Sequence, residues 1–260
     1  MATVRVETAP RVATVVLDRP EARNALSVEM CDELVAAFED VAASAHARVV
    51  LLRGEGRVFC AGADFAAVSG ASGLEFLPAF ERMLEAVAAF PLPVVAAIHG
   101  AALGGGLQLA TVCDFRIVAD DARLGIPAAR LGILVNLENV QRLVRLVGVA
   151  RAKEVLMTAR EYSGAGALAA GLVTRAVPAA DLEREAASFA DEIAALAPRA
   201  VQGAKRAIAS IERSLSDIRC TDAGGAGEVD ALVEAAYRSD DLQEGIAALN
   251  EHRPPRFGGR

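Results

Sequence analysis

The chain has 260 residues, of which 53% are hydrophobic but only 4% aromatic, and it contains no Trp. A chain of this length can bury one large core, which Ala, Val and Leu must fill, as in closely packed helices and buried strands. Its net charge of −7 argues against general binding to nucleic acid or to anionic membranes. The longest apolar run, about residues 86–98, is interrupted by Pro91 and Pro93, so we expect no membrane span.

The four cysteines have no closely spaced pairs: Cys31, Cys60, Cys113 and Cys220. Neither a zinc site nor a disulfide framework is therefore indicated, and we expect no metal ion. The first residues lack the charged and then apolar layout of a secretory signal. Together these observations favour a reduced, cytoplasmic protein.

Short apolar strands alternate with helices in the first half of the chain. Strands are expected at 12–17, 49–52, 94–98 and 115–119, and helices at 28–45 (capped by Ser27), 77–90 and 105–112. This alternation is typical of an α/β protein with a buried, mostly parallel sheet. Later residues predict helices at 137–147, 150–159, 181–196, 199–213, 227–238 and 241–251, one strand at 172–177, and a glycine-rich hinge at 222–227.

Two glycine turns carry the clearest chemistry. One expected strand leads into a small-residue turn at 61–64, and another leads into three consecutive glycines at 104–106 that open a helix. Glycine tolerates positive φ, and a helix N-terminus has free N–H groups and partial positive charge. Two such turns side by side can aim two backbone N–H groups at one developing oxyanion. Either turn alone is better explained by close packing of a helix on a strand, and phosphate-loop and dinucleotide fingerprints are absent.

Three ordered blocks, residues 18–26, 59–64 and 100–114, closely resemble the signature blocks of the crotonase superfamily, the enoyl-CoA hydratase/isomerase family. The resemblance extends from about residue 12 to residue 257. It implies an α/β fold, a crotonase-type spiral of ββα units with a C-terminal helical oligomerisation domain. The corresponding domains are residues 1–197, with the acyl-CoA site, and residues 198–260, which form a homotrimer or hexamer.

The resemblance also implies the site. The two oxyanion N–H groups fall on Ala61 and Gly105, and the ligand is a coenzyme A thioester of fatty acid metabolism, with no further cofactor. The residues that line the coenzyme A are then Glu21, Ala22, Arg23, Ala61, Gly62, Ala63, Asp64 and Gly105. The C-terminal helix of a neighbouring subunit brings Leu249 and His252 near the nucleotide. His252 stands where a Lys is usual, which puts a phosphate contact there in doubt.

The sequence departs from the family at the two hydratase glutamates, which fall on Gln108 and Ala128. Gln is a neutral amide that cannot accept a proton from water near pH 7, and Ala has no polar group. Each positioned acid or base contributes roughly 10²–10⁴-fold in rate, so we expect ordinary hydratase activity to be weak or absent. Other family members carry an acid further along the same wall of the site, and Glu138 is the candidate for that acid here. Both Glu138 and Asn136 also have structural explanations, because Asn136 is a good N-cap and an acid in the first turn of a helix is favourable.

Three functions therefore stay open. The first is an enzyme that forms thioester enolates by isomerisation, hydration or decarboxylation, with Glu138 or a bound water as base. The second is a catalytically inactive fatty acyl-CoA binder, carrier or regulatory partner in a lipid pathway, which the residues at 108 and 128 favour over ordinary hydration. The third is an oligomeric interaction module without a thioester ligand, and the retained glycine turns argue against it.

Overall fold

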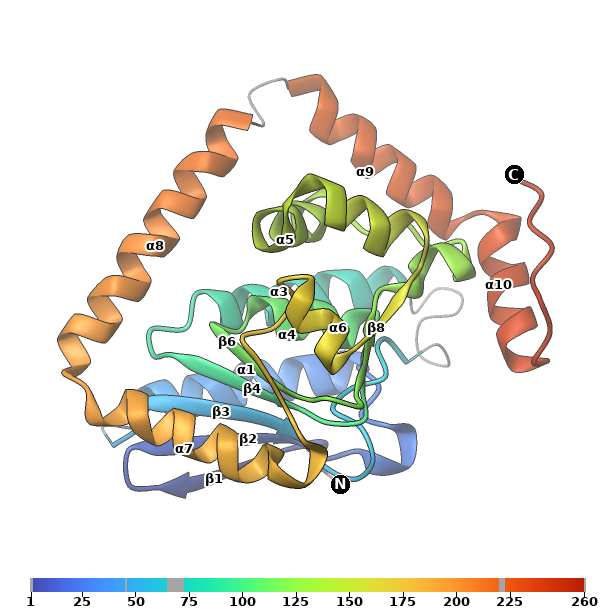
Figure 1. Ribbon diagram of the computed structural model, residues 1–260. Helices are drawn as coiled ribbons and strands as arrows, with labels where there is room; N and C mark the ends of the chain where they lie inside the picture. Colours follow the sequence, from blue (N-terminus) through green and yellow to red (C-terminus); the bar gives the residue numbers. More distant parts are fainter. Residues whose placement is uncertain (1, 45, 65–72, 220–222, 260) are drawn as a thin grey trace. The chain divides into compact units, whose positions relative to one another are not determined.

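The computed structural model describes residues 2–44, 46–64, 73–219 and 223–259 of the chain, shown in Figure 1. Its strands are β1 (Val4–Ala9), β2 (Val12–Leu17), β3 (Val49–Gly54), β4 (Val94–Ile98), β5 (Ala101–Leu103), β6 (Phe115–Ala119), β7 (Arg123–Gly125), β8 (Glu161–Ser163) and β9 (Arg175–Val177). Six of them form one sheet in the order β1-β2-β3-β4-β6-β9, and β5-β7-β8 form a second sheet. The mixed α/β class expected from the sequence is confirmed.

Strand pairing in the larger sheet is parallel from β2 to β9, and only β1 joins it antiparallel, beside β2. Every residue of β4 is buried, as expected for a parallel strand covered on both faces. Because these strands are parallel, the segments that follow β2, β3 and β4 all leave from the carboxyl edge of the sheet. This is the edge where parallel α/β proteins place their ligands.

The helices and 3-10 turns are η1 (Pro20–Ala22), α1 (Val28–Ala43), α3 (Gly73–Ala88), α4 (Gly105–Val112), η3 (Pro127–Leu131), α5 (Leu137–Met157), α6 (Gly164–Ala169), η4 (Ala179–Asp181), α7 (Leu182–Ala195), α8 (Pro198–Arg219), α9 (Ala223–Tyr237) and α10 (Asp240–Asn250). Ser27 caps α1 by accepting from Met30 N at 3.2 Å, as predicted. The two helices expected on either side of residue 148 are also confirmed, because Gly148 (φ 76°, ψ 163°) interrupts α5.

Several elements differ from the expectations. The strands β1, β5, β7 and β8 and the helix α6 are additional; β1 shows little periodicity because it is an edge strand with most side chains exposed. The hinge expected at 222–227 is wrong from residue 223 onward, since α9 begins at Ala223 and packs against α5 and α10. Residues 220–222 lie outside the described part of the chain.

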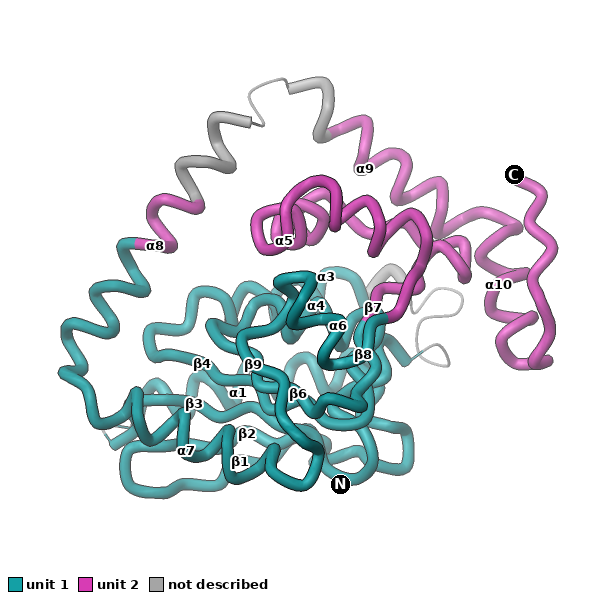
Figure 2. The backbone as a smooth tube through the Cα atoms, viewed as in Figure 1, with its two compact units in different colours: residues 1–124, 162–207 teal, residues 125–161, 208–260 magenta. Residues whose placement is uncertain are grey.

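The chain forms two compact units (Figure 2). Unit 1 contains residues 1–124 and 162–207, and unit 2 contains residues 125–161 and 208–260. The division therefore does not fall at residue 197. The first turns of α8 belong to unit 1 because Lys205 donates to Leu92 O at 2.9 Å and pairs with Asp114 at 2.6 Å.

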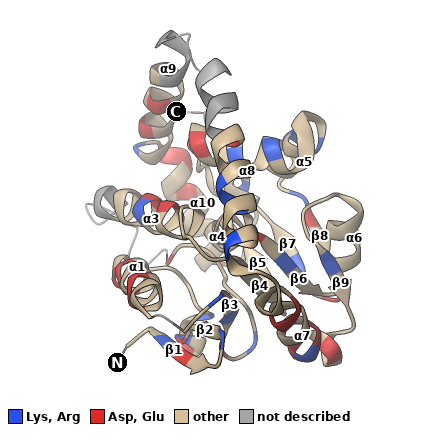
Figure 3. Cartoon of the chain, turned by 90° about the vertical axis from the view of Figure 1, so that its left-hand side faces the viewer, with Lys and Arg blue, Asp and Glu red and all other residues tan. Residues whose placement is uncertain are grey.

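Within unit 1, α7 packs on β2, β3, β4 and β6, while α1 contacts β1, β2 and α3. Figure 3 shows acidic residues along α7 and basic residues along α8. Among the described residues, no helix is long and apolar enough to cross a membrane.

Candidate functional site

The segment after β2 and the turn after β3 are joined by backbone hydrogen bonds at the carboxyl edge of the larger sheet. Leu26 N donates to Gly62 O at 2.8 Å, and Asp64 N donates to Leu26 O at 2.8 Å. At the outer side, Arg19 Nη1 and Asp64 Oδ2 form an ion pair of 2.5 Å. This ion pair fixes the end of the turn at Asp64.

The second turn brings the start of α4 against the first. Gly104 has φ 53° and ψ −119°, a conformation that a residue with a Cβ rarely adopts. A Cβ on Gly106 would lie 2.4 Å from Cys60 O, and one on Gly62 would lie 3.4 Å from Gly105 N. The sequence left two explanations for these glycines, close packing of a helix on a strand and the approach of the two turns. The glycines allow both.

The N–H groups at these turns differ in their availability. Ala61 N donates to Arg23 O at 3.0 Å, so its hydrogen is already bound within the protein. In the part of the chain that the structure describes, no hydrogen bond is made by Ala63 N or Gly105 N. The expectation that Ala61 supplies an oxyanion donor therefore conflicts with the geometry, and Ala63 is the donor that this turn leaves free.

The C-terminal end of α4 is held by Arg116, a residue outside the sites expected from the sequence. Its guanidinium is buried and donates to Ala110 O at 3.2 Å, Cys113 O at 2.6 Å and Leu172 O at 2.9 Å. Burial lowers the pKa of Arg116, and the helix carbonyls partly compensate the charge. In the sequence, the signal for this contact is one Arg within the otherwise apolar residues 115–119, directly after an apolar helix.

Gln108 and Ala128, the residues that the family resemblance places at the hydratase-glutamate positions, carry no carboxylate. Gln108 is half-buried on α4, and its side-chain amide has no hydrogen-bond partner among the described residues. Ala128 lies on η3 in unit 2, where its carbonyl accepts from Ile133 N at 3.1 Å. Neither residue can transfer a proton at neutral pH.

Glu138 and Asn136 have the structural roles that the sequence also suggested. Asn136 caps α5 by accepting from Asn139 N at 3.1 Å. Glu138 is 54% exposed and forms an (i, i+4) ion pair with Arg142. This arrangement favours helix stabilisation over catalysis for Glu138.

Other polar and thiol residues close to these segments in the sequence are structural as well. Asp114 accepts from Val94 N at 2.7 Å, and His99 Nε2 lies 3.0 Å from Gly56 O. Cys60 and Cys113 are buried free thiols, and desolvation raises the pKa of each to about 12. They are poor nucleophiles at neutral pH. Among the described residues, no cluster of three or more His, Cys, Asp or Glu could hold a metal ion.

Apart from Gly105 at the start of α4, the residues expected to line coenzyme A occupy the two joined segments. Glu21 and Arg23 are exposed, Ala22 is half-buried, and Arg23 has φ 55°. In unit 2, Leu249 is 49% exposed, and His252 is exposed with its Nδ1 3.1 Å from Asn250 O.

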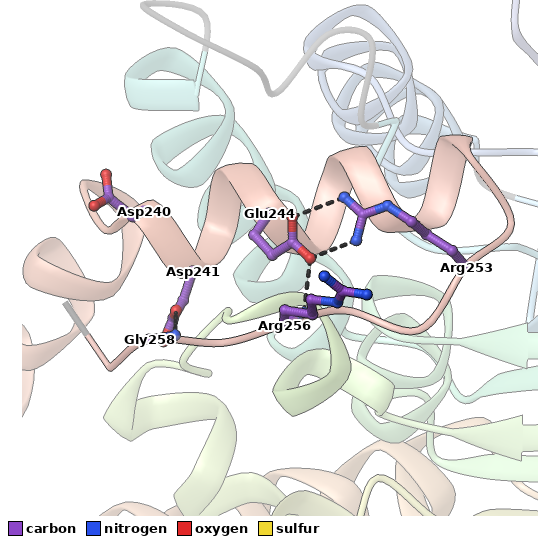
Figure 4. Close-up of a pocket in the computed structure, with 6 residues that line it drawn as sticks. All are labelled: Asp240, Asp241, Glu244, Arg253, Arg256 and Gly258. Carbon is purple, nitrogen blue, oxygen red and sulfur yellow. Dashed lines mark hydrogen bonds and ion pairs between the residues drawn. The ribbon is translucent and has the colours of Figure 1, made fainter.

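A pocket of about 460 Å³ lies in unit 2 between α10 and the C-terminal tail (Figure 4). Its acidic residues already bind the tail. Glu244 accepts from Arg253 at 2.6 and 2.8 Å and from Arg256 N at 2.7 Å. Asp241 accepts from Gly258 N at 2.6 Å and Gly259 N at 3.0 Å. The pocket is therefore better explained as the gap between α10 and a C-terminal tail that is hydrogen-bonded to it than as a ligand site.

This fastening predicts a local effect of Glu244→Gln. Hydrogen bonds from Arg253 and then from Arg256 N lower the pKa of Glu244 from 4.5 to about 2. Because the folded pKa is the lower one, the contribution is complete above pH 4.5 and is lost as the pH falls towards 2. At neutral pH, trypsin should cleave after Arg256 faster in Glu244→Gln than in wild type. Mass spectrometry measures the rate of this cleavage. Glu251→Gln, which removes another Arg253 partner but keeps Glu244, is the control, and equal rates in both variants would contradict the fastening.

Comparison with known proteins agrees with this picture along the whole chain. Residues 7–260 match the family model described as enoyl-CoA hydratase/isomerase. A probable enoyl-CoA hydratase of Bacillus subtilis (strain 168) is 36% identical over 253 residues, 95% of each chain. The probable enoyl-CoA hydratase echA6 of Mycobacterium tuberculosis (strain CDC 1551 / Oshkosh) is 38% identical over 259 residues, 98% of this chain and 99% of the relative.

Solved structures agree as well. An enoyl-CoA hydratase/carnithine racemase from Magnetospirillum magneticum has a TM-score of 0.77 and 32% identity, with 100% of this chain and 97% of the other covered. Methylmalonyl-CoA decarboxylase in complex with 2-nitronate-propionyl-CoA has a TM-score of 0.89 and 27% identity, with 99% of each chain covered. These relatives confirm the crotonase resemblance and favour an enzyme over a pure interaction module. The chain belongs to the enoyl-CoA hydratase/isomerase family.

Proposed function

We propose that this protein binds acyl-CoA thioesters and stabilises a negative charge on the thioester oxygen between Ala63 N–H and Gly105 N–H. The observation that carries the proposal is the approach of two turns whose donors have no acceptor among the described residues. Gly105 is also the first residue of α4, so the helix adds partial positive charge at this point. Donors fixed before the reaction are what an enolate requires.

Glycine at position 62 supports the same proposal. Gly62 is buried with φ 107°, and a Cβ there would lie 2.8 Å from Leu103 O. Any larger residue would push the two turns apart and separate their donors. The glycine therefore sets the spacing on which a shared oxyanion contact depends.

The reaction that fits best is one in which the enolate forms without a protein base. Gln108 and Ala128 supply no carboxylate, and Glu138 is paired with Arg142. In the decarboxylation of a 2-carboxyacyl thioester, the bond to the carboxylate breaks, its electron pair forms the enolate, and carbon dioxide leaves. The enolate then takes a proton from water. The likeness to methylmalonyl-CoA decarboxylase structures supports placing this reaction ahead of hydration.

The second candidate is a fatty acyl-CoA binder that performs no chemistry. It is favoured by the same two residues at positions 108 and 128. Such a protein would keep the thioester contacts and release its ligand unchanged. Neither candidate needs a cofactor other than the coenzyme A of the thioester itself.

Calorimetric titration with acetyl-, crotonyl-, octanoyl-, palmitoyl- and methylmalonyl-CoA tests both candidates. We expect saturable heat for at least one thioester and little for free coenzyme A. Release of carbon dioxide from methylmalonyl-CoA would support the decarboxylase, whereas binding without turnover of any thioester would support the carrier. Folded protein that gives no heat with any member of the panel would refute both.

We also propose that the working form is a homotrimer or a dimer of trimers, assembled through the C-terminal helices. On α8, Ile208 and Ile211 share one face and are 59% and 61% exposed, which is more apolar surface than a solvent-facing helix needs. In light scattering, Ile208→Asp with Ile211→Asp should lower the mass to that of one chain. Ser210→Asp, on the opposite face of α8, is the control. A wild-type monomer of 27.0 kDa at micromolar concentration would contradict the oligomer.

A cytoplasmic location belongs to the same proposal. It is supported by the absence of closely spaced cysteine pairs in the sequence and by the three described cysteines, which are free thiols. Free thiols of this kind are typical of reducing compartments.

A further inference from the structure

Asn24 is the polar residue most completely enclosed in the region of the two turns. It has no exposed surface, although it lies in a loop. The two hydrogens of its Nδ2 are shared among three carbonyl oxygens, Glu55 O at 2.9 Å, Val58 O at 2.9 Å and Phe59 O at 3.1 Å. Its Oδ1 accepts from Arg19 N at 3.0 Å. Oδ1 therefore fixes the side chain within the segment after β2, and Nδ2 joins this segment to the one after β3.

The backbone around Asn24 is shaped for this contact. Arg23 and Asn24 have φ of 55° and 54°, a left-handed conformation that Asn tolerates better than most residues. The same two residues reach the turn directly, because Arg23 O accepts from Ala61 N at 3.0 Å and Asn24 O accepts from Cys60 Sγ at 3.1 Å. The carbonyls that the amide holds come immediately before Cys60. The turn is thus fixed from both of its sides.

We infer that Asn24 is a positioning residue that sets the direction of the Ala63 N–H, so that this donor and the Gly105 N–H face one thioester oxygen. The inference rests on the proposed function, because it concerns the same oxyanion contact. Asn24 does not touch the ligand itself. It acts by holding the carbonyls of residues 55, 58 and 59, from which the chain continues directly into the 61–63 turn.

The variant Asn24→Asp separates this role from a general loss of stability. Aspartate has the same shape and keeps one acceptor for Arg19 N, but its ionised form places negative charge against three carbonyl oxygens. Its protonated form carries one O–H that can donate to one of them. Burial and these carbonyls favour the protonated form. The variant should therefore work at low pH and fail at high pH, whereas wild type should not change in this way.

Other titratable groups near this position are the same in wild type and variant. They are Arg19, Glu55, Cys60 and Asp64; Arg19 is paired with Asp64, and Glu55 is held by Arg5 and Arg53. A comparison of variant with wild type at each pH removes their contribution. Leu182→Ala, a core truncation on α7, controls for stability lost elsewhere in unit 1.

The probe is a cinnamoyl-CoA with a para-dimethylamino group, whose absorption moves to longer wavelength when hydrogen bonds polarise its carbonyl oxygen. We expect wild type and Leu182→Ala to give the full shift at about pH 5.5 and about pH 8.5. Asn24→Asp should give the full shift only at the lower pH. At the higher pH, its affinity for the probe should be about tenfold or more weaker than that of wild type. Hydrogen exchange of residues 55–64 without ligand, compared with wild type at each pH, should be faster in the variant only at the higher pH.

The two readouts distinguish this inference from the proposed function. If wild type shows no shift, the oxyanion contact fails, and hydrogen exchange alone decides whether Asn24 positions the turn. Unchanged exchange and a full shift in Asn24→Asp at the higher pH would overturn the inference. If Asn24→Asp does not fold, Asn24→Gly replaces it, since glycine adopts the φ of 54° but has no side chain to hold the carbonyls. A full shift with unchanged exchange in that variant would also overturn the inference, and a reduced shift with faster exchange of residues 55–64 would support it.

Discussion

Hydration of crotonyl-CoA by this protein should be at least about a hundredfold slower than by a family member with both glutamates. Gln108 and Ala128 offer no group that can take a proton from water or return one to the α-carbon. Replacing both in Gln108→Glu/Ala128→Glu should raise the rate by about a hundredfold or more, while each single replacement should give a smaller gain. A spectrophotometric assay of the enoyl thioester measures all four proteins.

Two results would contradict this prediction. Ordinary turnover by wild type would mean that another residue supplies the acid and base. A double variant that binds crotonyl-CoA normally but hydrates it no faster than wild type would mean that positions 108 and 128 do not face the double bond. Calorimetry on each variant separates loss of binding from loss of chemistry.

The variant Gly105→Pro should lose the acyl-CoA contact, because proline has no N–H to donate. Proline is tolerated at the first position of a helix, so α4 itself should form. A missing oxyanion donor typically lowers turnover by about 10²–10³-fold, and we expect no measurable heat with the acyl-CoA panel. The polarised absorption of the cinnamoyl probe should disappear with it.

The control for this variant is Gly105→Ala, which keeps the N–H. A Cβ at this position meets Phe80 Cε2 at 3.3 Å and Leu26 Cδ1 at 3.4 Å, so both variants share this contact, and proline adds only its Cγ and Cδ. The alanine variant should retain binding and most of the absorption shift. Equal losses in both variants, with matching circular dichroism, would mean that space rather than the N–H is what the ligand needs.

The sequence could predict those parts of the fold that local patterns determine. Fully apolar strands such as β4, the Ser27 and Asn136 caps and the break at Gly148 follow from burial, capping and backbone freedom over a few residues. The edge strand β1 could not be predicted in this way, because most of its side chains are exposed. The beginning of α9 could not be predicted either, because its first five residues include three glycines, which disfavour a helix.

The candidate site was predictable to the level of the turn but not of the individual atom. A glycine-rich turn after a strand can be read from the sequence, yet which of its N–H groups is free depends on Arg23 O, which binds Ala61 N. The same long-range pairing explains Asn24. In the sequence it is one polar loop residue among several, and only the folded chain surrounds it with the carbonyls of residues 55, 58 and 59.

A crystal structure of the protein with bound octanoyl-CoA would show the oxyanion contact itself. We expect the thioester oxygen to lie within hydrogen-bond distance, about 2.7–3.1 Å, of both Ala63 N and Gly105 N, with Ala61 N still bound to Arg23 O. A thioester held elsewhere, or one whose oxygen meets neither N–H, would contradict it.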